Sequence, residues 1–207
     1  MSRGNKIPFP RGRSAAQGTT IDSGDLQGVH LEGQVVYLPD TDPSDTKVRR
    51  SNNDVIARVV RNSSGETLLP KRLVTYSSGF HGRRVGGYSV EVDQFNIAGV
   101  VDDHLPSTGV QNNDLFYVII GGPCLVTTSV SAMTNAASAQ GAVVYAQTAS
   151  NSTGATGTTT AGRIQGISAT TDQGEDLSFV VTPVGIANTA IAVSDQAVDK
   201  LIDVKLT

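Results

Sequence analysis

The sequence contains one cysteine, no tryptophan and three histidines in 207 residues. The single cysteine, Cys124, excludes a disulfide within the chain, and its apolar neighbours Pro123 and Leu125 predict a buried thiol. The three histidines lie far apart in sequence, and HExxH, GxSxG and paired CxxC motifs are all absent. The lack of tryptophan also disfavours a sugar site, because such sites usually stack sugars on aromatic rings.

Long apolar runs are lacking as well. No run approaches the ~18 residues that a membrane helix needs, so we expect no contact with a membrane. The first 18 residues carry charges but not the apolar region of a signal peptide. With one unpaired cysteine, these absences favour synthesis in a cytoplasm over the secretory route.

The residues that are abundant favour β-structure. The chain has 22 glycines and 38% hydrophobic residues, and serine, threonine and alanine are frequent. Small and β-branched residues between turn signals suit many short strands. The sequence contains no long amphipathic helix, which argues against an α/β enzyme fold. We count about ten strands by this pattern. They are expected at 33–38, 55–60, 67–76, 88–92, 95–101, 114–128 (two strands broken at Gly121-Gly122-Pro123), 141–147, 162–170, 176–186 and 200–206.

The remaining segments are expected to connect these strands. Pro39 ends the first strand, NSSG at 62–65 is a turn by composition, and alternating apolar residues mark 200–206 as a strand. Ser194 could instead cap a short helix ending at Leu201, and both alternatives stay open. The other expected elements are a polar loop at 41–54, a glycine-rich loop at 79–87, a short helix at 131–140 and a low-complexity loop at 148–162.

The chain therefore divides into an extended basic arm, residues 1–25, and a β-rich body, residues 26–207. The arm contains Pro8 and Pro10, which oppose helix, and has no acidic residue before Asp22. Such an arm either orders on a partner, with Phe9 as an apolar anchor, or remains a disordered tail. The body is predicted to be mainly β, as a β-barrel, a β-tulip-like body or a sandwich with at most one or two short helices. The positive charges of the arm are Arg3, Lys6, Arg11 and Arg13.

Charge is unevenly distributed along the chain. Residues 1–84 hold 13 basic and 8 acidic groups, whereas residues 85–207 hold 3 basic and 11 acidic groups. This asymmetry suggests that a basic end meets an acidic surface, such as the second half of a neighbouring copy, or that both halves are simply solvated. Direct nucleic-acid binding is disfavoured, because the net charge is −3 and the basic residues are not interleaved with aromatics.

The sequence Asp102-Asp103-His104 is the strongest candidate for chemistry. On an extended segment Asp102 and His104 would share a face and Asp103 would not, so a metal would need further ligands such as Asp93 or Asp114. The alternative is a structured connection between strands, shaped by the following proline and glycine at 106 and 109. The second interpretation fits the composition better, so we predict no catalytic residue, no metal and no cofactor.

Three segments resemble the capsid decoration, or cement, proteins of tailed bacteriophages. They are ARVVRNSSGETLLPKRLVTY, NIAGVVDDHLPSTGVQNNDLFYVIIGGPCLV and GRIQGISATTDQGEDLSFVVTPVGI, within residues 55–187. That family carries units in which a glycine and two apolar residues lead to a turn, a polar residue with glycine, and a further apolar strand. Gly99-Val100-Val101, Gly109-Val110, Gly122-Pro123 and Gly166-Ile167 stand at such places.

The resemblance implies a small β-barrel or β-tulip body that forms oligomers, often trimers, on the outer surface of an icosahedral head. The partners it implies are the major capsid protein and further copies of the chain, and it implies stabilisation of the head in the virion against the pressure of packaged DNA. The alternatives are a tail- or fibre-associated virion protein, or a metal-dependent hydrolase using Asp102 and His104. The residues expected to contact the capsid or another subunit are Arg3, Lys6, Phe9, Arg11, Arg13, Arg83 and Arg84.

Overall fold

The computed structural model describes residues 7–15, 31–87, 96–128, 140–141, 143–146, 164–166, 183–192 and 198–206. The expected strand at 88–92, the loop at 148–162 and the start of the arm at residues 1–6 lie outside the described residues. So does the expected helix at 131–140, apart from Gln140.

The protein is mainly β, as the sequence predicts. Its described residues form ten strands that are hydrogen-bonded into one sheet, and every pairing is antiparallel except that of β2 with β4. The strands are β1 Val35–Thr41, β2 Arg49–Asn62, β3 Leu73–Tyr76, β4 Arg84–Gly87, β5 Ile97–Val101, β6 Leu115–Thr127, β7 Val143–Ala146, β8 Ile164–Gly166, β9 Pro183–Ala187 and β10 Asp199–Lys205.

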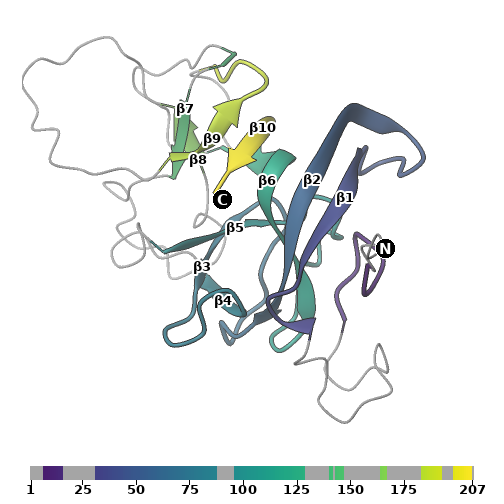
Figure 1. Ribbon diagram of the computed structural model, residues 1–207. Coiled ribbons are helices and arrows are strands. Elements are labelled where there is room, and N and C mark those ends of the chain that lie inside the picture. Colours follow the sequence, from purple (N-terminus) through teal and green to yellow (C-terminus); the bar gives the residue numbers. More distant parts are fainter. Residues whose placement is uncertain are drawn as a thin grey trace, which may run out of the picture.

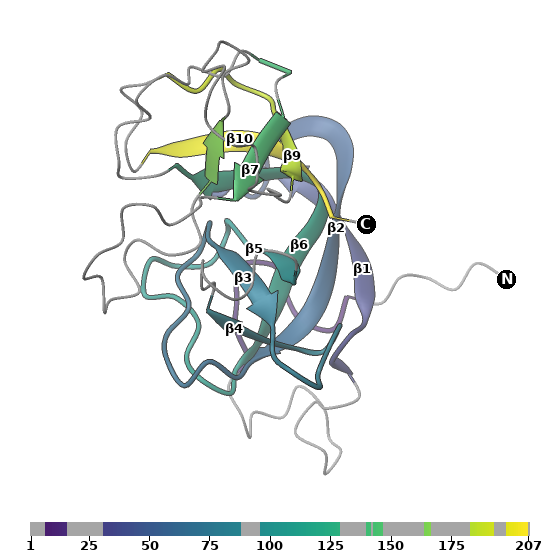
Figure 2. The same cartoon turned by 90° about the vertical axis from the view of Figure 1, so that its left-hand side faces the viewer.

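Five strands close on themselves. The sheet order runs β1-β2-β4-β3-β5-β6-β10-β9-β7-β8, and a further pairing joins β2 directly to β6. Strands β2, β4, β3, β5 and β6 therefore form a ring of hydrogen-bonded neighbours, with β1 outside it as a hairpin partner of β2 (Figure 1). The second half of β6 leaves this ring and pairs with β10, which begins the other part of the sheet (Figure 2).

Strand β6 is buried on both faces, which explains its continuous apolar sequence. Leu115, Tyr117 and Ile119 belong to one core cluster, together with side chains of β1, β2, β9 and β10. Phe116 and Val118 alternate with them and belong to a second cluster, shared with β3, β4 and β5. Successive side chains of a strand point to opposite faces, so one strand supplies both cores.

The first hairpin is longer than the sequence suggests. The expected loop at 41–54 is wrong in its second half, because β2 begins at Arg49. Strand β1 also continues through Pro39 to Thr41. Pro39 is tolerated because β1 lies at the edge of the sheet, where a strand can lack one backbone donor.

The predicted break at Gly121-Gly122-Pro123 is also wrong, because β6 runs without interruption from Leu115 to Thr127. Gly122 has a φ of +85°, and the register of β2 against β6 shifts between Ile56 and Ala57. The glycines therefore bend the strand, and β6 changes partner from β2 to β10 at this point.

Two further predictions have clear outcomes. The expected loop at 79–87 holds only for its first part, because Arg84–Gly87 form β4. The strand at 200–206 is confirmed as β10, in which Ile202 and Val204 are buried. Within the described residues there is no α-helix. Nor does any helix in that part have the length and apolar character needed to cross a membrane.

Candidate functional site

Residues 7–15, here called the strap, pack against the body of their own chain. The ring of Phe9 stacks on Tyr117 with centroids 4.4 Å apart, and the Tyr117 hydroxyl donates a 2.8 Å hydrogen bond to the Phe9 carbonyl. Burial raises the pKa of Tyr117 to about 12. Ala15 and Leu115 exchange backbone hydrogen bonds of 2.8 and 3.0 Å. Both alternatives given for the arm, ordering on a partner and a disordered tail, are therefore wrong for this part of it.

A buried cluster of opposite charges holds the strap in place. Arg11 donates from Nε to Asp102 at 3.0 Å and from Nη2 to Asp103 at 2.9 Å. Arg50, from β2, donates to the other oxygen of Asp103 at 2.9 Å and contacts Asp40 at the end of β1. Both carboxylates of the pair 102–103 are almost inaccessible to solvent. The cluster joins the strap, the first hairpin and the β5–β6 connection.

The backbone conformation explains why the side chains of Asp102, Asp103 and His104 lie close together. Residues 103–104 form a turn directly after β5, with the Leu105 amide bonded to the Asp102 carbonyl at 3.2 Å. The expectation that Asp103 would face away from its neighbours assumed an extended segment and is wrong. Ligand atoms of Asp102, Asp103 and His104 instead lie within 4.8 Å of one another.

His104 has a hydrogen-bond partner at each of its two ring nitrogens. Its Nδ1 lies 2.8 Å from an oxygen of Asp103, and its Nε2 lies 2.9 Å from the hydroxyl of Thr41. Burial opposes the charged imidazolium, but the hydrogen bonds to Asp102 and Asp103 outweigh it and raise the pKa of His104. The strap passes very close, because a Cβ at Gly12 would lie 2.9 Å from the His104 carbonyl.

Asp103 is the centre of the cluster. Its two oxygens accept from Arg11, Arg50, His104 and the backbone amide of Leu125 in β6. Burial alone would raise the pKa of Asp103, but the His104 hydrogen bond and the two guanidinium charges hold it well below its ordinary value.

The cluster already uses the atoms that would bind a metal. Asp102 accepts from Arg11 with one oxygen and from the Gly12 amide, at 3.3 Å, with the other. Both oxygens of Asp103 are also occupied by donors. A cation at this position would have to displace Arg11 or Arg50 from its carboxylate and would be repelled by the remaining guanidinium. The arrangement fits a structural ion-pair network better than a metal site.

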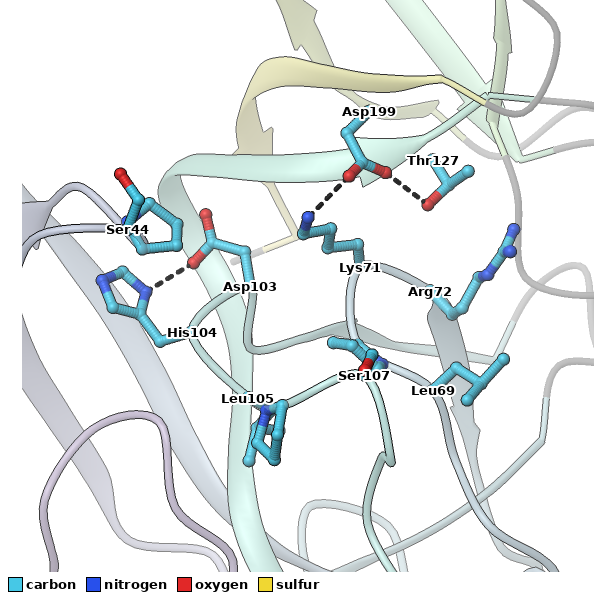
Figure 3. A pocket seen from close by; sticks show the side chains of 13 residues that line it. Ser44, Leu69, Lys71, Arg72, Asp103, His104, Leu105, Ser107, Thr127 and Asp199 are labelled. Atoms are coloured by element: carbon cyan, nitrogen blue, oxygen red, sulfur yellow. Dashed lines mark hydrogen bonds and ion pairs between the residues drawn. The ribbon is translucent and has the colours of Figure 1, made fainter.

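A pocket of about 570 Å³ opens beside the cluster. Figure 3 shows His104 and Asp103 on one side, and Lys71 pointing to Asp199 on the other. The Lys71 ammonium lies 2.5 Å from Asp199, which also accepts a 2.8 Å hydrogen bond from Thr127. Lys71 and Asp199 thus neutralise each other on the lining, and no phenylalanine or tyrosine is among the described residues that line the pocket.

A second buried carboxylate, that of Glu32, is surrounded by three arginines. The side chain of Glu32 is inaccessible to solvent and lies 2.5 Å from Nε of Arg61. Arg84 lies 3.2 Å from its other oxygen and Arg83 lies 3.9 Å away. The guanidinium of Arg84 also stacks over the ring of Phe80, at 4.4 Å.

The structure distributes the predicted contact residues over three environments. Phe9 is buried and Arg11 is partly buried, with 9% of its side chain exposed, so little of either side chain is available to another protein. Arg13 is exposed, and Arg83 and Arg84 surround Glu32. Arg3 and Lys6 lie outside the described residues. The seven residues therefore do not form one surface in the part of the chain that is described.

Sequence reasoning missed the partners of these residues, namely Glu32, Asp40, Thr41, Arg50 and Tyr117. Contacts such as that of Arg11 with Asp102 span about ninety positions, and no local pattern indicates them. One general signal was available. Acidic residues directly after an apolar strand, as at 102–103, are often buried and then need cations nearby.

No family model matches this sequence. No curated protein matches it either.

Proposed function

We propose that this chain is a structural virion protein, which decorates the outer surface of an icosahedral phage head and bridges major capsid subunits. Its closed ring of β2, β4, β3, β5 and β6 would be a small β-barrel, the body that the sequence resemblance implies. Further copies of the chain and the major capsid protein would be its partners, with no direct contact to nucleic acid or membrane. We infer no catalytic role.

The observation that supports this proposal most is that the residues with the most chemical potential, Asp102, Asp103 and His104, make structural contacts. Asp102, Asp103 and His104 tie the strap, the first hairpin and β6 into one unit through Arg11 and Arg50. A network that cross-links segments distant in sequence resists separation of those segments. Such bracing is useful in a protein that holds a shell together under internal pressure.

Retention on purified heads tests the proposal. Heads lacking the protein should bind it when it is added back, and should then resist heating better than untreated heads. Many modest contacts repeated by the symmetry of the shell would give stable retention. If mature heads purified from infected cells never contain the protein, the proposal fails.

The metal-dependent hydrolase remains as an alternative because three ligand atoms converge. The matching test is metal analysis of the purified protein together with a His104→Ala variant. Stoichiometric metal that is lost in the variant would favour the hydrolase, whereas metal below stoichiometry in the wild type would remove it.

A further inference from the structure

The turn between β3 and β4 presents an aromatic ring at a fixed position on the surface. Phe80 is 41% exposed, which is high for a phenylalanine. Its amide donates to Ser77, and its carbonyl accepts from the amides of Arg83 and Arg84 at 3.0 and 3.1 Å. Gly79 and Gly82, both with φ of +77°, let the chain turn on either side of it. The backbone that carries this exposed ring is therefore fixed by hydrogen bonds.

Arginines surround this ring. Arg84 stacks on Phe80, and Arg83 is half exposed beside it. Arg58, from β2, contacts both the hydroxyl and the ring face of Tyr76. The ring of Tyr76 meets that of His81 edge-on, at 5.8 Å. We call the set the Arg-aromatic surface, and it consists of Arg58, Tyr76, Phe80, His81, Arg83 and Arg84.

Among the residues that the structure describes, this surface carries an excess of positive charge. Glu32 is the carboxylate that Arg83 and Arg84 approach, and its closest contact is with Arg61. Within the described residues, one buried negative charge thus faces three guanidinium groups, and Arg58 adds a fourth cation nearby. Charge of one sign at a surface favours a partner of the opposite sign.

We propose that the Arg-aromatic surface binds an acidic polypeptide segment of another protein. Tyrosine, phenylalanine and arginine are the residue types enriched at the centres of protein interfaces. Their fixed positions lower the entropy lost on binding. A polypeptide fits better than nucleic acid, because Glu32 lies among the arginines and the whole chain is net acidic, at −3. Only the identity of the partner, the major capsid protein, rests on the proposed function.

The test compares two matched double variants. Phe80→Ser/Arg83→Glu removes one exposed apolar ring and reverses one exposed charge on the surface. Val48→Ser/Arg49→Glu makes the equivalent change at the first hairpin, where both side chains are exposed. Unfolding by urea should show all three proteins folded under the binding conditions, which separates binding effects from misfolding. The surface variant should have a somewhat lower midpoint, because its new carboxylate lies near Glu32.

Poly-L-glutamate serves as the first probe, and binding of double-stranded DNA is measured for comparison. At low salt the wild type and the hairpin variant should bind poly-L-glutamate alike, and the surface variant should bind about tenfold more weakly. Failure of the wild type to bind, or equal binding by all three proteins, overturns the proposal. Binding to DNA that is as tight as binding to poly-L-glutamate also overturns it, in favour of a general polyanion site.

Retention on purified heads and sedimentation of the free protein show whether the partner is the capsid or a second copy of the chain. Under the proposal, heads retain the wild type and the hairpin variant but lose the surface variant. If heads retain all three proteins equally, the surface inference fails and the capsid function stands. If heads retain none while poly-L-glutamate binding behaves as expected, the capsid function fails and the surface stands. A wild-type oligomer in sedimentation that becomes monomeric in the surface variant would instead assign the surface to a second copy.

Discussion

His104 sets the charge balance of the buried cluster. Three carboxylates, on Asp40, Asp102 and Asp103, face the two guanidinium groups of Arg11 and Arg50. With a neutral imidazole the cluster carries one net negative charge, and with an imidazolium it carries none. Unbalanced charge is unfavourable away from water, so the protonated form of the histidine stabilises the fold.

This balance predicts a loss of stability at alkaline pH. The pKa of His104 is raised above its ordinary value of 6.5, so its stabilising contribution is complete below that value and is lost as pH rises through the raised pKa. Urea unfolding between about pH 6 and pH 9 should show this decline. A His104→Gln variant should be less stable at the acidic end and show a flatter profile. His81→Gln, at an exposed site, should keep the wild-type profile, and an identical slope in both variants would contradict the assignment.

Arg11 and Arg13 lie two positions apart, but substituting them should change the free energy of unfolding by very different amounts. Arg11→Gln leaves two buried carboxylates short of a partner and should lower the free energy of unfolding by about 3–5 kcal/mol. Arg13 is exposed, so Arg13→Gln should change it by less than about 0.5 kcal/mol. Denaturant unfolding at neutral pH measures both. Similar small losses in the two variants would show that the cluster does not hold the strap.

At the scale of single elements, β6 depends on one glycine. Gly122 has a left-handed backbone conformation, and a Cβ there would lie 2.5 Å from the Asp54 carbonyl oxygen. Gly65 has a similar φ of +80°, but nothing lies within 4 Å of its Cβ position. Gly65→Ala should therefore cost only backbone strain, about 1 kcal/mol, whereas Gly122→Ala should cost at least 1–3 kcal/mol more by overpacking. Equal losses by thermal unfolding would contradict the packing described for β2 and β6.

The same strand shows what the sequence could and could not predict. Alternation at Ile202 and Val204 identified β10, because burial on one face leaves a local pattern. Strand β6 is buried on both faces, so its apolar run gave no period, and Gly122 resembled a strand end. Whether a glycine bends a strand or ends it depends on the partner strands available on either side. That information lies far away in the sequence.

The candidate site was predictable only in part for the same reason. Asp102, Asp103 and His104 are adjacent, so their chemistry was visible as a motif. Their actual partners come from the strap and the first hairpin, at Arg11 and Arg50. Residue types alone could not decide between a metal and a guanidinium as the balancing charge, because both satisfy a buried carboxylate.

At the scale of the whole molecule, the strap joins both core and cluster. It contributes Phe9 and Ala15 to the apolar cluster that contains β1, β2, β6, β9 and β10. Arg11, two positions after Phe9, belongs to the buried ion-pair cluster. Apolar and charged anchors so close together on one segment should act as a unit, and their effects on stability should not be additive.

Deletion of the strap tests this coupling. Removing residues 1–15 exposes Tyr117 and leaves Asp102 and Asp103 without Arg11, so the deletion should lower the thermal midpoint strongly. The double variant Phe9→Ala/Arg11→Gln should reproduce most of that loss, and its effect should be smaller than the sum of the single substitutions. Hydrogen exchange at the Leu115 amide, which donates to Ala15, reports directly on release of the strap. If that amide stays protected in the double variant, the two anchors do not hold the strap and the backbone pairing at Ala15 is sufficient.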